Sequence, residues 1–277
     1  TGYLAHKWGL ESKLPGSHPY VSVPPSGWTP ADIDTDLWLD SSDTSTFSAQ
    51  DNPSNLIQQW DDLSGNNHHA TQSNPNIMPE YSDGVVVFEN DSFMNLDLDF
   101  LIGDSHSAFF VIETPGTFQS FLYGAANGGG GSDSPHVGFS DGQFAPPAGN
   151  YLMNLWGNDS DFAPTPAFQS SGTNIVQFEW LPGVSRSVWA NGNLEGQDIS
   201  GSTPAITTIP GGGRFVGVIP DRYPFMDVNI SEVIFLPGSE LNQTNYDLIT
   251  GYLAHKWGLE GQLSPTHPYR DIPPIAN

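Results

Sequence analysis

The amino-acid sequence predicts an all-β protein: an antiparallel two-sheet sandwich of jelly-roll type with one C-terminal α-helix. Two observations lead to this fold class. Short apolar or alternating runs recur between residues 30 and 240 and are punctuated by Gly, Pro, Asn and Asp, a pattern that is typical of the strands of a sandwich. A single helical pattern of apolar residues stands near the C-terminus.

The runs that we expect to form strands are spread over the middle of the chain. They are residues 37–39, 85–88, 108–113, 118–123, 151–156, 174–180, 187–190, 214–218 and 229–236. Residues 174–191 indicate a hairpin, because VQFEW and SVWA flank the turn-like segment LPGVSR. The Asn191–Gly192 pair then favours a second tight turn toward Leu194.

The C-terminal helix is predicted over about residues 243–257. Asn242 is a suitable N-cap, and Gly258 suits a left-handed C-cap. His255 and Lys256 fall in the last turn, where positive charge complements the helix dipole. The apolar stripe between the caps consists of Tyr246, Ile249, Leu253 and Trp257.

The two ends of the sequence repeat each other. Residues 1–20 read TGYLAHKWGLESKLPGSHPY and residues 250–269 read TGYLAHKWGLEGQLSPTHPY, with 15 of the 20 positions identical at an offset of 249. The simplest explanation is a tandem array of units of about 249 residues. We therefore expect residues 1–23 to be the tail of a preceding repeat with a Pro-rich linker, and residues 24–277 to form one domain.

The chain is very acidic, with 7 Lys and Arg against 31 Asp and Glu and a formal net charge of −24. So few basic residues exclude a nucleic-acid partner. No apolar run approaches the ~20 residues of a membrane-spanning helix, so we expect no direct membrane insertion. There is no cysteine, which excludes disulfides and thiol catalysis. The carboxylates must then be neutralised by solvent and salt or by Ca²⁺.

Five segments resemble the concanavalin A-like, laminin G-like jelly-roll modules of very large bacterial surface proteins. They are WTPADIDTDLWLDSSD (28–43), IQQWDDLSGNNHHATQ (57–72), SVWANGN (187–193), ISEVIFLPGSELN (230–242) and GYLAHKWGL (251–259). The resemblance implies a secreted module of an adhesin at the bacterial cell surface, in a calcium-rich medium. It also implies glycans or neighbouring adhesin domains as partners, or a purely structural role.

Carboxylates and side-chain amides gather in the first two of these segments. Hard cations such as Ca²⁺ favour these oxygen ligands, together with backbone carbonyls on a tight glycine turn, and the resemblance implies a loop that can carry calcium. The predicted calcium ligands are Asp40, Asp43, Asp61, Asp62, Ser64, Asn66 and Glu232. The alternative is a network of Asx-turns that shapes the loop without a metal.

Two further segments have the composition of a sugar-binding surface, and both look like loops beyond strands. Lectins stack sugar rings on Trp or Tyr and hydrogen-bond the hydroxyl groups with Asp and Asn. The predicted ligand-binding residues are Trp156, Asn158, Asp159, Asp161, Asp221, Arg222 and Tyr223. The alternative is an aromatic side chain that packs beneath a loop.

No set of nucleophile, base and orienting residue stands out in the sequence, and neither does a cofactor motif. We therefore expect a non-catalytic extracellular module, stabilised by Ca²⁺, that acts as a tandem spacer, a glycan binder or both. One alternative is a polysaccharide-degrading enzyme of the concanavalin-like fold, with Asp97 and Asp99 on one face of a strand. Another is a metal-free, purely structural repeat.

Overall fold

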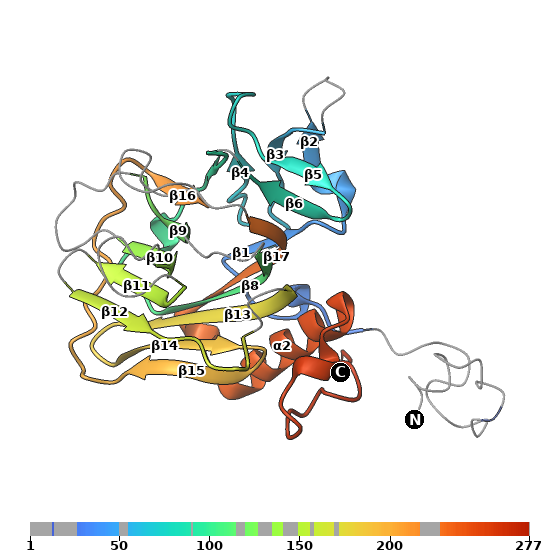
Figure 1. Cartoon of the computed structure of the whole chain (residues 1–277), viewed down its shortest axis with the longest axis vertical. Helices are drawn as coiled ribbons and strands as arrows, with labels where there is room; N and C mark the ends of the chain where they lie inside the picture. Colours follow the sequence, from blue (N-terminus) through green and yellow to red (C-terminus); the bar gives the residue numbers. More distant parts are fainter. Residues whose placement is uncertain are drawn as a thin grey trace.

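The computed structural model describes residues 13, 27–49, 55–89, 91–114, 120–126, 135–140, 149–155, 158–168, 172–216 and 228–276. Within these residues the strands form two antiparallel sheets (Figure 1). The eight-stranded sheet has the order β15 (Asn193–Asp198), β14 (Ser185–Ala190), β13 (Gly172–Leu181), β8 (His106–Thr114), β17 (Val228–Pro237), β6 (Val85–Phe88) and β5 (Glu80–Ser82), and β1 (Leu37–Asp40) also pairs with β17.

The second sheet has nine strands in the part of the chain that the structure describes. Their order is β12 (Asn158–Phe162), β11 (Tyr151–Leu155), β10 (Pro135–Phe139), β9 (Ser120–Ala125), β16 (Gly213–Phe215), β7 (Met94–Asn95), β4 (Ala70–Thr71), β3 (Ile57–Trp60) and β2 (Phe47–Ala49). The helical elements are η2 (Pro30–Asp32), η3 (Thr44–Thr46), η4 (Asp99–Leu101), η6 (Gly238–Glu240), α2 (Gln243–Trp257) and η7 (Glu260–Gln262).

The main core lies between the two sheets, because one face of each strand turns inward. On β8 the inward side chains are Ala108, Phe110 and Ile112. Phe109 and Val111 alternate with them, point to the opposite face and belong to a second core. β8 is therefore apolar at every position from 108 to 112, as expected of a strand that is buried on both faces.

Helix α2 covers the outer face of the eight-stranded sheet and closes the second core. Ile249, Leu253 and Ala254 of the helix pack with Ile234 and Leu236 of β17. The predicted caps are confirmed: the Asn242 side chain accepts a hydrogen bond from the backbone of Asn245, and Gly258 has a φ of 71°. The predicted bounds of the helix are confirmed as well.

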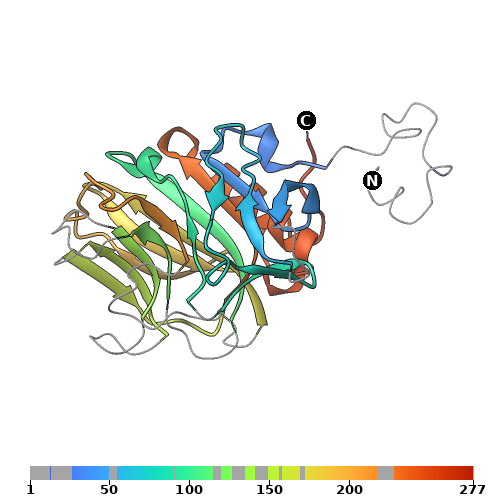
Figure 2. The ribbon, with the colours of Figure 1, turned by 90° about the horizontal axis from the view of Figure 1, so that it is seen from above.

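The all-β fold class and the hairpin are also confirmed. β13 pairs with β14 across residues 176–190, and β14 then pairs with β15 beyond the Asn191–Gly192 turn. β1 and β17 come from opposite ends of the domain and lie side by side in Figure 2. The sandwich is thus closed by strands that are far apart in the sequence.

Two local predictions were wrong. Residues 158–162 form the edge strand β12 rather than a loop. The predicted strand face with Asp97 and Asp99 does not form, because β7 ends at Asn95 and Asp99 begins the 3-10 helix η4. The Asp97 carboxylate accepts a hydrogen bond from the backbone N–H of Asp99 at 3.0 Å, which bends the chain at this point.

None of the helices in the described residues is long and apolar enough to span a membrane.

Candidate functional site

The predicted calcium ligands do not form one group, and two of them lie beneath helix α2. Asp40 on β1 and Glu232 on β17 are cross-strand partners. Glu232 shares its strand face with Ile234 and Leu236, whose side chains pack against α2. The turn that contains Asp62 lies beside the start of β1, where the Asp62 carboxylate accepts a hydrogen bond from the Trp38 backbone.

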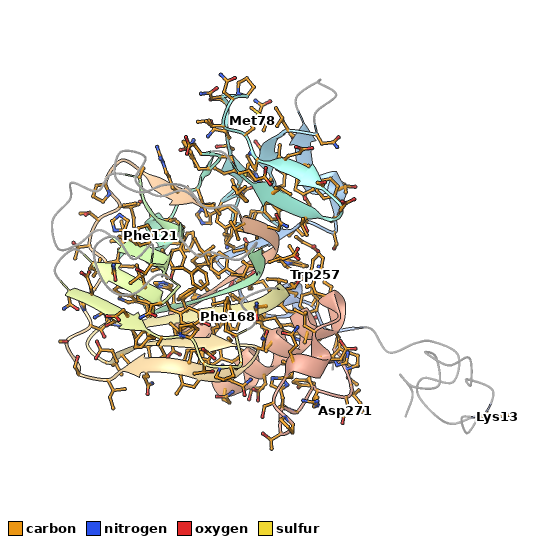
Figure 3. The ribbon with its side chains drawn as sticks, viewed as in Figure 1. Lys13, Met78, Phe121, Phe168, Trp257 and Asp271 are labelled. Atoms are coloured by element: carbon orange, nitrogen blue, oxygen red, sulfur yellow. The ribbon has the colours of Figure 1, made fainter. Side chains whose placement is uncertain are left out.

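The Glu232 side chain is fully buried and accepts hydrogen bonds from four side chains. Oε1 accepts from Trp38 Nε1 at 2.8 Å and from the Tyr252 hydroxyl at 3.0 Å. Oε2 accepts from Trp257 Nε1 at 2.7 Å and lies 2.8 Å from Lys256 Nζ. Tyr252, Lys256 and Trp257 all belong to α2, so the Glu232 carboxylate attaches the last turns of the helix to the sheet. Trp257 is labelled in Figure 3.

The Lys256 ammonium group joins the two carboxylates. It donates to Asp40 Oδ2 at 2.5 Å while it contacts Glu232. The other Asp40 oxygen accepts from the backbone and the hydroxyl of Ser42. Burial raises the pKa of Glu232, and the nearby Lys256 partly opposes this shift. We call Glu232, Asp40, Lys256, Tyr252, Trp38 and Trp257 the Glu232 cluster.

Asp62 organises the WDDLSGNN loop through four hydrogen bonds. Oδ1 accepts from the backbones of Trp38 and Ser64, each at 2.9 Å. Oδ2 accepts from the Ser64 hydroxyl at 2.7 Å and from the backbone of His68 at 3.1 Å. The Asn66 amide donates to the Thr35 carbonyl at 2.8 Å. Asp62, Ser64 and Asn66 are therefore brought together in an Asx-type network, which is the alternative to a calcium site.

Asp43 and Asp61 each have a local partner. Asp43 caps η3 by accepting from the backbone and the hydroxyl of Ser45, and these hydrogen bonds lower its pKa. Asp61 accepts from the Gln59 amide at 2.6 Å. Among the described residues, no group of three or more His, Asp and Glu side chains has a metal-binding arrangement. Calcium binding stays a prediction.

The predicted ligand-binding residues on β12 divide between the two faces of the strand. Met153 is a core residue and pairs with Ser160, so Ser160 turns inward. Asp159 and Asp161 therefore turn outward, and both are exposed. Trp156, Asp221, Arg222 and Tyr223 lie outside the described residues.

Asn158 points into the sandwich, where it holds a buried arginine. Arg186 of β14 donates to Asn158 Oδ1 at 2.6 Å, to the Asn158 carbonyl at 2.7 Å and to the Met153 carbonyl at 2.8 Å. The same guanidinium lies 3.3 Å from the carboxylate of Asp198, which also accepts from Ser160 at 2.8 Å. Arg186 thus joins the edges of the two sheets.

Sequence reasoning did not single out Arg186. A signal was available, because Arg186 alternates with Val188 and Ala190 in the run SRSVWA and so belongs to the inward face of its strand. A charged residue at such a position needs fixed polar partners. Its partners come from β11, β12 and β15, and the sequence does not indicate which strands lie nearby.

Glu179 on β13 is the second glutamate beneath α2. Its carboxylate accepts a hydrogen bond from the Tyr246 hydroxyl. Burial raises the pKa of Glu179, and the hydrogen bonds from Tyr246 and Ser187 partly oppose this shift. Glu179 and Glu232 are therefore both used to attach the helix to the sheet.

A cavity of about 360 Å³ lies beside the Glu232 cluster. Tyr252, His255 and Lys256 line it from α2, and residues 27–29 and 273–275 line it from the two ends of the domain. It combines aromatic rings, proline rings and a shared ammonium group. No carboxylate pair faces it, since Glu260 is the one acidic residue among those that line it.

The fold defines this chain as a two-sheet β-sandwich protein. No protein-family model and no curated protein matches it. Among solved structures it is similar to the binding domain of Paraclostridial Mosquitocidal Protein 1, with 12% sequence identity and a TM-score of 0.56, over 80% of this chain and 52% of that one. The chain thus spans about half the length of that structure.

Two other similar structures have lower TM-scores. A mutant of Trypanosoma rangeli sialidase displaying trans-sialidase activity is 14% identical, with a TM-score of 0.48 over 87% of this chain and 36% of that one. Domain 4 of AbnA, a GH43 extracellular arabinanase from Geobacillus stearothermophilus, in complex with arabinotriose, is 16% identical, with a TM-score of 0.45 over 64% and 86%.

Proposed function

We propose that this chain is a non-catalytic, glycan-binding module of a secreted bacterial surface adhesin, built as a tandem repeat and stabilised by calcium. The observation that carries the binding part is the outward pair Asp159 and Asp161 on the edge strand β12. Neighbouring outward side chains of one strand are about 6–7 Å apart, so the two carboxylates can accept hydrogen bonds from different hydroxyl groups of one bound sugar. Trp156 stands two residues before Asn158 in the sequence.

The buried glutamates support the non-catalytic part. A general acid or base must reach the bond that it acts upon. Glu232 is fully buried, and each of its oxygens has two donors, while Glu179 is buried against Tyr246. These two carboxylates serve the packing of α2. The fold also occurs in a protein domain described as a binding domain.

The Glu232 cluster supports the tandem part. Tyr3, Lys7 and Trp8 stand at the offset of 249 from Tyr252, Lys256 and Trp257. The first copy of the repeated segment therefore carries the same three donors that hold Glu232 in the second copy. If a preceding unit has a buried carboxylate equivalent to Glu232, Tyr3, Lys7 and Trp8 would bind that carboxylate in the same way.

A glycan array tests the binding part. The chain should give reproducible hits, and the double variant Asp159→Asn/Asp161→Asn should lose them, because an amide is a weaker acceptor for sugar hydroxyls than a carboxylate. Asp97→Asn/Asp99→Asn is the matched control, since it removes two exposed carboxylates elsewhere. Hits that survive in the β12 variant would refute the role of Asp159 and Asp161 in glycan binding, whereas an array with no hits at all would leave only the spacer role.

The alternative enzyme is tested with the same proteins. Incubation with the polysaccharides that score on the array should leave their chain length unchanged in size-exclusion chromatography. Shortened chains would refute the non-catalytic proposal. If the Asp97→Asn/Asp99→Asn variant then lost that activity, the catalytic residues would lie at the start of η4.

A further inference from the structure

The point where the chain enters the domain is joined to the point where it leaves. The Trp28 backbone N–H donates to the Pro274 carbonyl at 3.2 Å, and Gly27 forms an antiparallel bridge with Ile275. The Trp28 ring also packs edge-on against Tyr252 of α2, with 6.0 Å between ring centroids. The entry segment (residues 27–29) and the exit segment (residues 272–276) are therefore paired with each other, and both line the 360 Å³ cavity.

The sequence repeat places this structure at the border between consecutive units. At the offset of 249, Pro273 and Pro274 correspond to Pro24 and Pro25, and Ala276 corresponds to Gly27. Ile275 is thus the last residue of its own unit, where it pairs with Gly27. Position 276, the counterpart of Gly27, is then the first paired residue of the next unit. No residue remains between them to act as a free linker.

Chain geometry then limits how far neighbouring units can separate. Pro274 pairs with Trp28, whose counterpart in a following unit is position 277, three residues further on. An extended chain spans at most about 3.5 Å per residue. The next unit must therefore begin within about 10 Å of the cavity.

The surface at this border is suited to contact. Ile272 and Ile275 are large apolar side chains of the exit segment, and they are 45% and 38% exposed. Pro273 and Pro274 lie between these two side chains and line the cavity. The exposed apolar side chains Ile272 and Ile275 are therefore available to a neighbouring unit.

We propose that consecutive units of the array meet directly at this cavity, and that a second copy of the unit covers Ile272 and Ile275 to form a junction of fixed geometry. This inference rests on the tandem part of the proposed function. It describes an array that is a rod of fixed shape rather than a string of independently tumbling domains.

The experiment uses a fusion in which residues 1–275 are followed directly by residues 27–277. A comparison protein carries about 12 Gly and Ser residues between the two copies, a flexible linker. The chain has no cysteine, so Ile199→Cys in each copy, at a side chain that is 73% exposed, accepts one spin label per unit. Double electron–electron resonance then measures the distance between the units.

The direct fusion should give a distance distribution several-fold narrower than that of the comparison protein. Ile272→Asp in the first copy should broaden it and leave the melting temperature of both units unchanged. A direct fusion as broad as the comparison protein, or an Ile272→Asp fusion as narrow as its parent, would overturn the proposal. Glycan-array hits from the same fusions report on the binding proposal separately, because the distance measurement needs no ligand.

Discussion

Asp40 and Glu232 face each other on the antiparallel strands β1 and β17, and a single lysine, Lys256, contacts both carboxylates. Two buried acidic side chains at adjacent positions would repel each other without that ammonium group. The repeated GYLAHKWGL motif thus has a structural purpose in this domain: its tyrosine, lysine and tryptophan fasten the last helix to the first and last strands of one sheet.

Replacement of Lys256 by Met should destabilise the domain strongly. The change leaves Asp40 and Glu232 without their cation, and breaking a buried ion pair costs about 3 kcal/mol or more. Urea unfolding at pH 7 measures this loss. Lys13→Met removes an exposed lysine and is the control. If both variants unfolded at the same urea concentration, the cluster would not hold the helix.

The contribution of Glu179 should depend on pH. Burial raises its pKa above the ordinary value of 4.5 in the folded protein, so the folded state holds the proton more tightly than the unfolded state. Its contribution to stability is therefore present in full below pH 4.5 and is lost as the pH rises through the folded pKa. Glu179→Gln cannot ionise, so its stability relative to the parent should increase from pH 4 to pH 8.

Urea unfolding of Glu179→Gln and the parent at a series of pH values measures whether their difference in stability changes in this direction. Glu80→Gln changes an exposed glutamate on the edge strand β5 and should keep the parent profile. A difference between Glu179→Gln and the parent that stayed constant with pH, or that grew toward acid, would contradict the expected role of burial.

Loss of the Arg186 guanidinium should loosen the joined edges of the sandwich. Arg186→Met removes the donor to two carbonyl groups and to the Asn158 amide oxygen, and it removes the cation beside Asp198, which keeps its hydrogen bond from Ser160. We expect a loss of about 3–5 kcal/mol in the free energy of unfolding. Arg186→Lys should recover only part of this free energy, because one ammonium group cannot replace the several N–H donors of the planar guanidinium group.

Hydrogen exchange localises this effect. The backbone amides of β12 should exchange faster in Arg186→Lys than in the parent. Arg270→Lys, at a half-buried position outside the sheets, should leave the exchange of β12 unchanged. Protection of β12 that stayed intact in Arg186→Met would show that the two sheet edges are held together by other contacts.

Calcium should raise the melting temperature of metal-stripped protein. A ligand that binds only the folded state at 100 times its Kd adds about 2.7 kcal/mol, which corresponds to about 5 °C or more for a domain of this size. EDTA should reverse the effect. Asp62→Asn should abolish the response to calcium, while Asp97→Asn should retain it. Identical melting curves with calcium and with EDTA would rule out calcium stabilisation.

The parts of the fold that sequence reasoning predicted depend on local signals. Helix α2 is bounded by Asn242 and Gly258, whose preferences act within one turn, and the β13–β14 hairpin joins neighbouring segments. The edge strand β12 was missed because NDSDF reads as polar loop, although Ser160 and Phe162 alternate inward. The partners of Glu232 and Arg186 depend on strand pairings over long separations, which no local pattern encodes.

The position of β17 in its sheet has a consequence for how the domain folds. β17 pairs with β1 and β6 on one side and with β8 on the other, so it connects the early strands of the domain to the β8–β13–β14–β15 half. Residues 228–237 lie close to the end of the domain. A chain that emerges from its N-terminus onward cannot close this sheet until residues 228–237 are available, so we expect slow folding in which the domain is completed as a whole.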